Sequence, residues 1–344
     1  MDLIRKPLAL ALALLLLPAV VSATTLRYTD HEPLGAMRTR FIKDVLFPAI
    51  EKESHGRLKI EEHWGGELST GYDALRTVRE GNNADIGIVV PEYTAKELPL
   101  HQLFKSFPTG PSGDKQIAFF RRVYAEIPAF PAELAKNGVV DIFLSTGYPV
   151  AFFSTHPLEK LQNIKGTAWR SASFWHQNFL RNAGATPVTT PWGEQTVNAF
   201  KTGKLDGILV NIDSGYDLKI QKMAPEVIVS KELWLGHLYL LVMNHKVWNG
   251  LAQEDKDAIT RAANTAYKVA GSMMDHSVEP QLDALRKDGA NVRVLQHSEV
   301  TYWQEVTGYQ DIQANWVKNQ EAAGVKDVAS TLQKVSKVME EAMK

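Results

Sequence analysis

ADIGIVV, residues 84–90, is the stretch that decides the fold of this 344-residue chain. Apart from one carboxylate and one glycine it is aliphatic, which is typical of a strand covered on both faces in a parallel sheet. A helical pattern at 72–80 precedes it, and an alternating, half-buried strand pattern at 57–61 comes before that helix. Strands that alternate with helices in this way predict an α/β fold with much parallel pairing.

The same alternation continues through the second half of the chain. Buried strand patterns occur at 139–144, 205–210 and 238–243, with helical patterns between them. From Gln253 onward an alanine-rich stripe predicts one long helix, which we expect Pro280 to interrupt near its downstream end. Because no repeat or low-complexity linker separates the halves, we expect two α/β lobes joined by strands.

Composition limits the classes of function. The chain is 44% hydrophobic with a net charge of −1, and it lacks the basic block that nucleic acid or an anionic membrane would select. The absence of cysteine excludes disulfides, thiol catalysis and cysteine-based metal sites. Phosphate-loop, dinucleotide and zinc-protease motifs are missing, and His55 and His63 lack metal-ligand spacing. We therefore expect no cofactor, no metal and no enzymatic activity.

Residues 1–23 have the pattern of a cleaved secretory signal. Arg5 and Lys6 precede an apolar run at 8–21, which is too short to span a membrane, and a small-residue cleavage site ends at Ala23. We expect the mature protein to work in the periplasm without inserting into a membrane.

Four further groups of motifs occur in a characteristic order. They are SHGRLKI (54–60) with GGEL (65–68) and GNNADIG (81–87), HPL (156–158) with IKGTAWR (164–170), PWGE (191–194) with AFKTGKLDG (199–207), and VWNGL (247–251). Together they resemble the DctP-type solute-binding proteins of tripartite ATP-independent periplasmic (TRAP) transporters, over most of the mature chain.

The resemblance implies a type II-like periplasmic binding protein with two lobes, a ligand cleft between them and a long C-terminal connecting helix. Lobe I is expected to comprise residues 24–147 plus about 237–275, and lobe II residues 148–236 plus about 276–344. By hinge closure the lobes would capture a small organic acid and deliver it to the membrane subunits of a TRAP permease.

The resemblance assigns the ligand carboxylate to Arg170, whose planar guanidinium offers two parallel donors to such a group. Trp192 is expected to form an aromatic wall. Asn211 stands one place later than the family's ligand-binding asparagine, and Asp213 follows it. In the first lobe, His31 and Glu92 come after strands, and ligands of open α/β sheets lie beyond the carboxyl ends of strands.

The expected ligand is a monocarboxylate. Several family members carry a second arginine where this chain has Tyr148, so one cation fewer would face the ligand. Tyr148, Trp169 and Trp192 make the region aromatic, which favours an aromatic, hydroxy or keto acid and leaves a sugar acid open. The alternatives are an exported α/β enzyme acting on small organic acids, which needs a perturbed acid or base near Arg170, and a ligand-sensing module.

Overall fold

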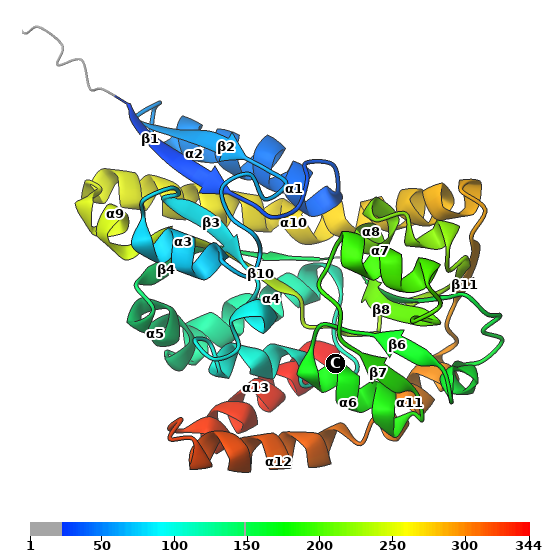
Figure 1. The fold of residues 1–344 in the computed structure, drawn as a ribbon. Coiled ribbons are helices and arrows are strands. Elements are labelled where there is room, and N and C mark those ends of the chain that lie inside the picture. The colour runs from blue at the N-terminus through cyan, green and yellow to red at the C-terminus, as the bar shows by residue number, and fades with distance from the viewer. Residues whose placement is uncertain (1–22, 148) are drawn as a thin grey trace, which may run out of the picture.

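The chain builds two β-sheets that lie side by side in Figure 1. The computed structural model describes residues 23–147 and 149–344. The first sheet has the order β2-β1-β3-β10-β4, formed by β1 (Thr24–Thr29), β2 (Leu58–His63), β3 (Ile86–Val89), β4 (Val139–Thr146) and β10 (Leu238–Asn244). The second has the order β11-β9-β5-β8-β6-β7, formed by β5 (Val150–Ser154), β6 (Ala168–Arg170), β7 (Thr186–Val188), β8 (Gly207–Asn211), β9 (Glu226–Ser230) and β11 (Asn291–Val294).

β3 confirms the interpretation of the stretch at 84–90. All four of its residues are buried, and it pairs in parallel with β1 on one side. On its other side it pairs antiparallel with β10, which also pairs antiparallel with β4. The first sheet is therefore mixed, with a strand from late in the chain inserted between two early ones.

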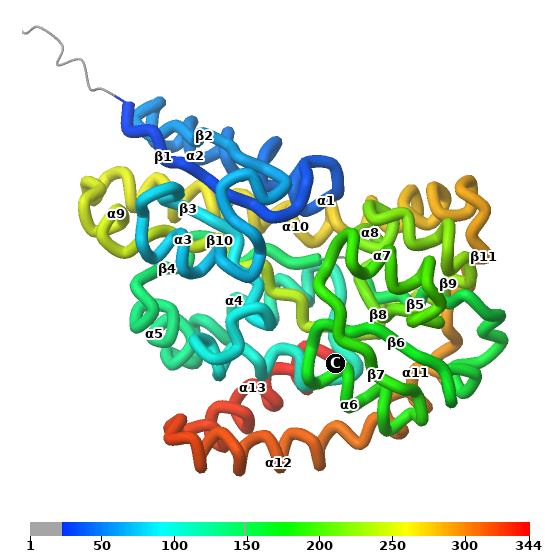
Figure 2. Tube along the Cα trace, in the orientation of Figure 1, coloured from blue at the N-terminus to red at the C-terminus, as the bar shows by residue number. Residues whose placement is uncertain are grey.

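The chain passes between the two sheets more than once, as the trace in Figure 2 lets the reader follow. It leaves the first sheet after β4, and β5 then enters the second sheet antiparallel to β8 and β9. Residues 231–237 lead back from β9 to β10. The predicted two-lobed α/β fold is confirmed, and the residue limits of the lobes stay a prediction.

Helices cover both sheets. They are α1 (Met37–Phe41) and α2 (Phe47–Glu53), joined by a π-helical turn (Ile42–Leu46), then α3 (Ala74–Glu80), α4 (Gly113–Glu126), α5 (Ala129–Lys136), α6 (Phe174–Asn182), α7 (Glu194–Lys201), α8 (Ile212–Asp217), α9 (His245–Gly250), α10 (Gln253–Lys287), α11 (His297–Val306), α12 (Tyr309–Ala322) and α13 (Val328–Met343). Near the C-terminus, α13 packs against α4 and α12 packs against α6. No helix within 23–147 and 149–344 has both the length and the apolar character needed to cross a bilayer.

The long connecting helix is α10, which runs along both lobes in Figure 1. It contacts α2 and α4 on the first lobe and α8 and β11 on the second. The expectation that Pro280 interrupts it is wrong, because the helix continues to Lys287. Proline removes one backbone hydrogen bond, but the buried side chains of Val278, Leu282 and Leu285 hold this end of the helix in the core.

Trp169 on β6 yields a test of the second lobe's core. Its side chain is fully buried, and its indole Nε1 donates to Thr167 Oγ1 at 2.6 Å. Its ring fills the space over Gly207, where a Cβ atom would lie 2.5 Å from the indole. We predict that Trp169→Ala lowers the free energy of unfolding by about 3–5 kcal/mol, because it opens a cavity.

Urea unfolding followed by circular dichroism measures this loss, with Phe174→Ala as the control. Phe174 is 53% exposed, so its truncation should cost less than about 1 kcal/mol. Equal losses in the two variants would contradict the structural role of Trp169.

Candidate ligand-binding site

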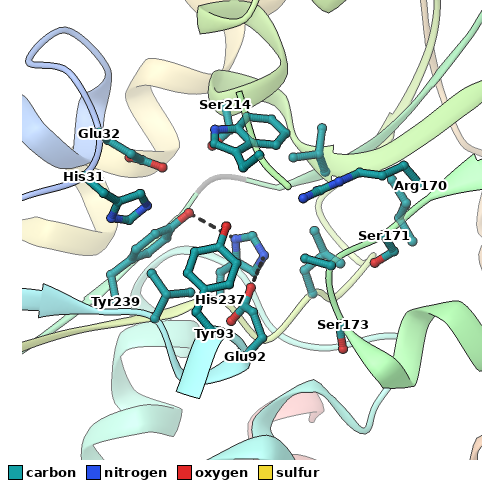
Figure 3. A pocket seen from close by; sticks show the side chains of 16 residues that line it. His31, Glu32, Glu92, Tyr93, Arg170, Ser171, Ser173, Ser214, His237 and Tyr239 are labelled. Carbon is teal, nitrogen blue, oxygen red and sulfur yellow. Dashed lines mark hydrogen bonds and ion pairs between the residues drawn. The ribbon is translucent and has the colours of Figure 1, made fainter. Parts of the chain in front are cut away.

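A cavity lies between the two lobes, where the carboxyl ends of several strands meet (Figure 3). Its empty space is about 460 Å³, including the opening to solvent. Segments that follow β1, β3, β6 and β8 line it together with the return segment before β10. The lining residues are His31, Glu32, Val90, Glu92, Tyr93, Arg170, Ser171, Ala172, Ser173, Trp192, Leu209, Val210, Ser214, Leu235, His237 and Tyr239.

Arg170, the last residue of β6, brings a buried cation to this cavity. Its side chain points inward in Figure 3, and the residue is only 3% exposed. Nε and Nη2 donate to the carbonyl oxygen of Thr190 at 3.2 and 3.1 Å, and the guanidinium carbon lies 5.1 Å from the ring centre of Trp192. Within the described residues no carboxylate forms an ion pair with it. Burial accordingly lowers the pKa of Arg170.

Arg38 is a buried arginine of a different kind. Nη1 donates to Asp30 Oδ2 at 2.8 Å and Nη2 to Glu32 Oε2 at 2.6 Å, so its charge is neutralised inside the protein. Burial alone would raise the pKa of Asp30, but the charge and hydrogen bonds of Arg38, together with His31 and Tyr28, hold that pKa below its usual value. Figure 3 shows Glu32 and Arg170 on opposite sides of the cavity.

A second charged pair stands on the first-lobe wall. Lys105, which is 1% exposed, donates from Nζ to the carbonyl oxygen of Leu235 at 3.0 Å and lies 3.1 Å from Glu92 Oε1. His237 Nε2 lies 3.6 Å from the same oxygen. Burial, followed by the charge of Lys105, lowers the pKa of His237 well below its usual value, so this imidazole is neutral at pH 7.

Three lining side chains have a buried polar atom without a hydrogen-bond partner in the described part of the chain. These atoms are His31 Nδ1, Glu92 Oε2 and Ser173 Oγ. Buried polar atoms are normally paired, so each of these needs an explanation. Together with Arg170 they make this cavity the strongest candidate for a ligand site.

The structure brings four of the predicted site residues to the cavity: His31, Glu92, Arg170 and Trp192. The first two come from the first lobe and the other two from the second. Trp192 is half-buried, and it covers the guanidinium of Arg170 while also packing against the edge of the second lobe's core.

The other predicted residues are placed elsewhere. Asn211 lies behind the cavity, where its Nδ2 is 2.8 Å from His237 Nδ1. Asp213 is buried at the start of α8, and its Oδ1 accepts a hydrogen bond from the Ser214 amide. Trp169 packs in the core and does not line the cavity. Tyr148 lies outside the described residues.

Sequence reasoning missed Tyr93, Lys105, His237 and Tyr239. Tyr93 directly follows Glu92, and Lys105 is a single charge within an otherwise largely apolar stretch, so both left a signal in the sequence. His237 and Tyr239 reach the cavity only because β10 returns to the first sheet, which no local pattern reveals. Within residues 23–147 and 149–344 no group of three or more acidic or histidine side chains is arranged to hold a metal.

Comparison with known proteins identifies one matching family. The family model of the bacterial extracellular solute-binding protein, family 7, matches residues 44–315. The ectoine-binding periplasmic protein TeaA of Halomonas elongata is 22% identical over 258 residues, or 74% of this chain and 71% of TeaA.

Two solved structures share the fold. The TRAP solute binding protein from Rhodoferax ferrireducens T118, in complex with copurified benzoate, matches with a TM-score of 0.81 at 16% identity, over 93% of this chain and 99% of its own. DctP7, a Bordetella pertussis extracytoplasmic solute receptor binding pyroglutamic acid, matches with a TM-score of 0.74 at 20% identity, over 91% and 99% of the two chains.

Asp213 yields a prediction about pH. Burial, followed by the negative charge of Glu32, raises the pKa of Asp213 from 3.8 to about 8. Between these values the folded protein holds a proton that the unfolded chain has lost, so this residue makes the free energy of unfolding fall as pH rises towards 8. We predict that Asp213→Asn removes up to about 1.4 kcal/mol of this fall per pH unit.

Urea unfolding at pH 5, 7 and 8.5 measures the effect. Asp283→Asn, a change in a carboxylate exposed on α10, should leave the pH dependence of wild type in place. If Asp213→Asn also follows the wild-type curve, the carboxyl group is ionised in the folded protein and the prediction fails.

Proposed function

The chain belongs to the bacterial extracellular solute-binding proteins of family 7, and we propose that it captures a small monocarboxylate. It is a periplasmic solute-binding protein of the TRAP type, a class that binds solutes and does not catalyse reactions. This membership sets aside the exported enzyme that the sequence left as an alternative.

The observation that carries the proposal is the guanidinium of Arg170. It is buried at the cavity wall, and its partner among the described residues is a backbone carbonyl instead of an acid. A buried charge is costly unless it is paired. A ligand carboxylate would supply the missing charge and would match the fork of donors that arginine presents.

Aromatic rings around the cavity favour a planar or cyclic ligand body. Trp192 covers Arg170, and Tyr93 and Tyr239 line the first-lobe side of the cavity. Such rings offer flat apolar faces together with a polar tip. The benzoate and pyroglutamic acid bound by the two structural relatives are both cyclic monocarboxylates, which supports this choice of ligand class.

The proposed closure of the lobes follows from the positions of Arg170 and Tyr93, which lie on different lobes. A ligand on Arg170 that also reaches Tyr93 touches both lobes, and these contacts coexist only when the lobes are together. Because such a ligand binds the closed form better, it shifts the hinge equilibrium towards closure. In this proposal the closed form is the one that delivers the acid to the TRAP permease.

We predict that Arg170→Gln weakens acid binding by about 30- to 1,000-fold, since it removes one partner of a buried charge pair. Isothermal titration calorimetry against benzoate, pyroglutamate, 3-hydroxybenzoate and galacturonate measures the loss for every acid that binds wild type. The corresponding amides should bind neither protein.

Arg181→Gln is the matched control, because Arg181 is exposed on α6 of the same lobe. It should bind acids as wild type does. Unchanged affinity in the Arg170→Gln variant would refute the carboxylate role of Arg170.

A further inference from the structure

We propose that the captured acid carries a hydrogen-bond donor, a hydroxyl or an N–H, and that Glu92 Oε2 accepts it. This inference rests on the proposed function and narrows its ligand class from monocarboxylates in general to those with a second, donating group. The residues involved are Glu92 itself and the side chains that fix it from behind, Lys105 and His237.

The two oxygens of Glu92 are in different situations. Oε1 lies 3.1 Å from the Lys105 ammonium and 3.6 Å from His237 Nε2. Oε2 is buried and has no hydrogen-bond partner among residues 23–147 and 149–344. The side chain is only 5% exposed, and Glu92 lines the cavity. One oxygen therefore anchors the side chain, and the other is left without a partner in a residue that lines the cavity.

The anchor is rigid because Lys105 is held at a second point. Its Nζ also donates to the carbonyl oxygen of Leu235, in the segment that returns to the first lobe. Lys105 is almost completely buried on the 3-10 helix Leu100–Lys105, so its ammonium has little freedom to move towards Oε2. Figure 3 shows Glu92 and His237 linked beneath the cavity, while Arg170 reaches in from another side.

The chemistry of a carboxylate decides whether the ligand group that meets Oε2 must donate or accept a hydrogen bond. A carboxylate that is paired with an ammonium accepts hydrogen bonds and donates none. The other unpaired lining atoms are less selective, because the Ser173 hydroxyl can donate or accept and a histidine nitrogen can do either, depending on its tautomer. Among these three buried unpaired atoms, Glu92 Oε2 is therefore the one that distinguishes a donor from an acceptor on the ligand.

A binding site built around an unpaired acceptor rejects an analogue that leaves the acceptor unsatisfied. For one buried hydrogen bond to a charged group we expect a preference of about 10- to 100-fold for the acid with the donor. The preference should persist across ligand bodies of different shape, because it belongs to Glu92 and not to the aromatic walls.

The experiment compares matched acids by isothermal titration calorimetry on the wild-type protein. One pair is 3-hydroxybenzoate and 3-fluorobenzoate, which differ in the donor while keeping a ring of similar size. The other is pyroglutamate and its lactone analogue, 5-oxotetrahydrofuran-2-carboxylate, in which oxygen replaces the N–H. We expect the donor-bearing member to bind at least about 10-fold more tightly in each pair that binds.

Glu92→Gln tests the assignment to this residue. The amide oxygen can keep the contact with Lys105, which puts the amide NH₂ in the place of Oε2 and replaces an acceptor by a donor. The preference should therefore disappear or reverse in favour of the lactone. Glu279→Gln, a change in an exposed carboxylate on α10, should keep the wild-type preference. Thermal melting confirms that each variant is folded, and the wild-type comparison decides the question even if Glu92→Gln does not fold.

The outcomes separate this inference from the proposed function. Acids that bind through Arg170 without any preference for a donor overturn the inference and leave the proposed function in place. A preference that survives in Glu92→Gln also overturns it, because another group must then recognise the donor. If none of the four acids binds, or if binding does not depend on Arg170, the proposed function fails and the inference fails with it.

Discussion

The pairing of Arg170 with a carbonyl oxygen instead of an acid is the constraint on which the rest of the site depends. A buried guanidinium without a counter-charge raises the free energy of any state in which water is kept from it. The protein tolerates this cost because Trp192 and the Thr190 carbonyl offset part of it. In the proposed function, a ligand carboxylate would supply the counter-charge that the side chain of Arg170 lacks.

Three buried cations, Arg38, Lys105 and Arg170, differ in how their charges are balanced. The charge of Arg38 is balanced by Asp30 and Glu32, and these contacts hold the segment after β1 in place. Lys105 lies near one acid, Glu92, whose second oxygen has no hydrogen-bond partner among the described residues. Arg170 lacks an acidic partner within the described residues. The three cations differ in how many acids each one meets rather than in how deeply each is buried.

Much of the fold was predictable from the sequence, because strand and helix patterns are local. The site was predictable in part. Arg170 and Trp169 are neighbours on β6, and successive strand residues face opposite sides of a sheet, so the cavity can receive only one of them. The arginine lines the cavity and the indole packs in the core. Strand alternation predicts that the two side chains face opposite sides of the sheet, but it does not predict which of them faces the cavity. His237 and Tyr239 were hidden, since their place depends on the pairing of β10 with β3 and β4, which lie far away in the sequence.

The position of β10 also governs the order in which the protein can form. β4 pairs with β10 and β3 is completed by it, yet β10 follows almost the entire second sheet in the chain. Until this return strand is in place, β3 has an open edge and β4 has no strand partner. Such non-local pairing makes folding slow. A fragment that ends before Leu238 would keep these strand edges open, and open edges favour pairing with other chains.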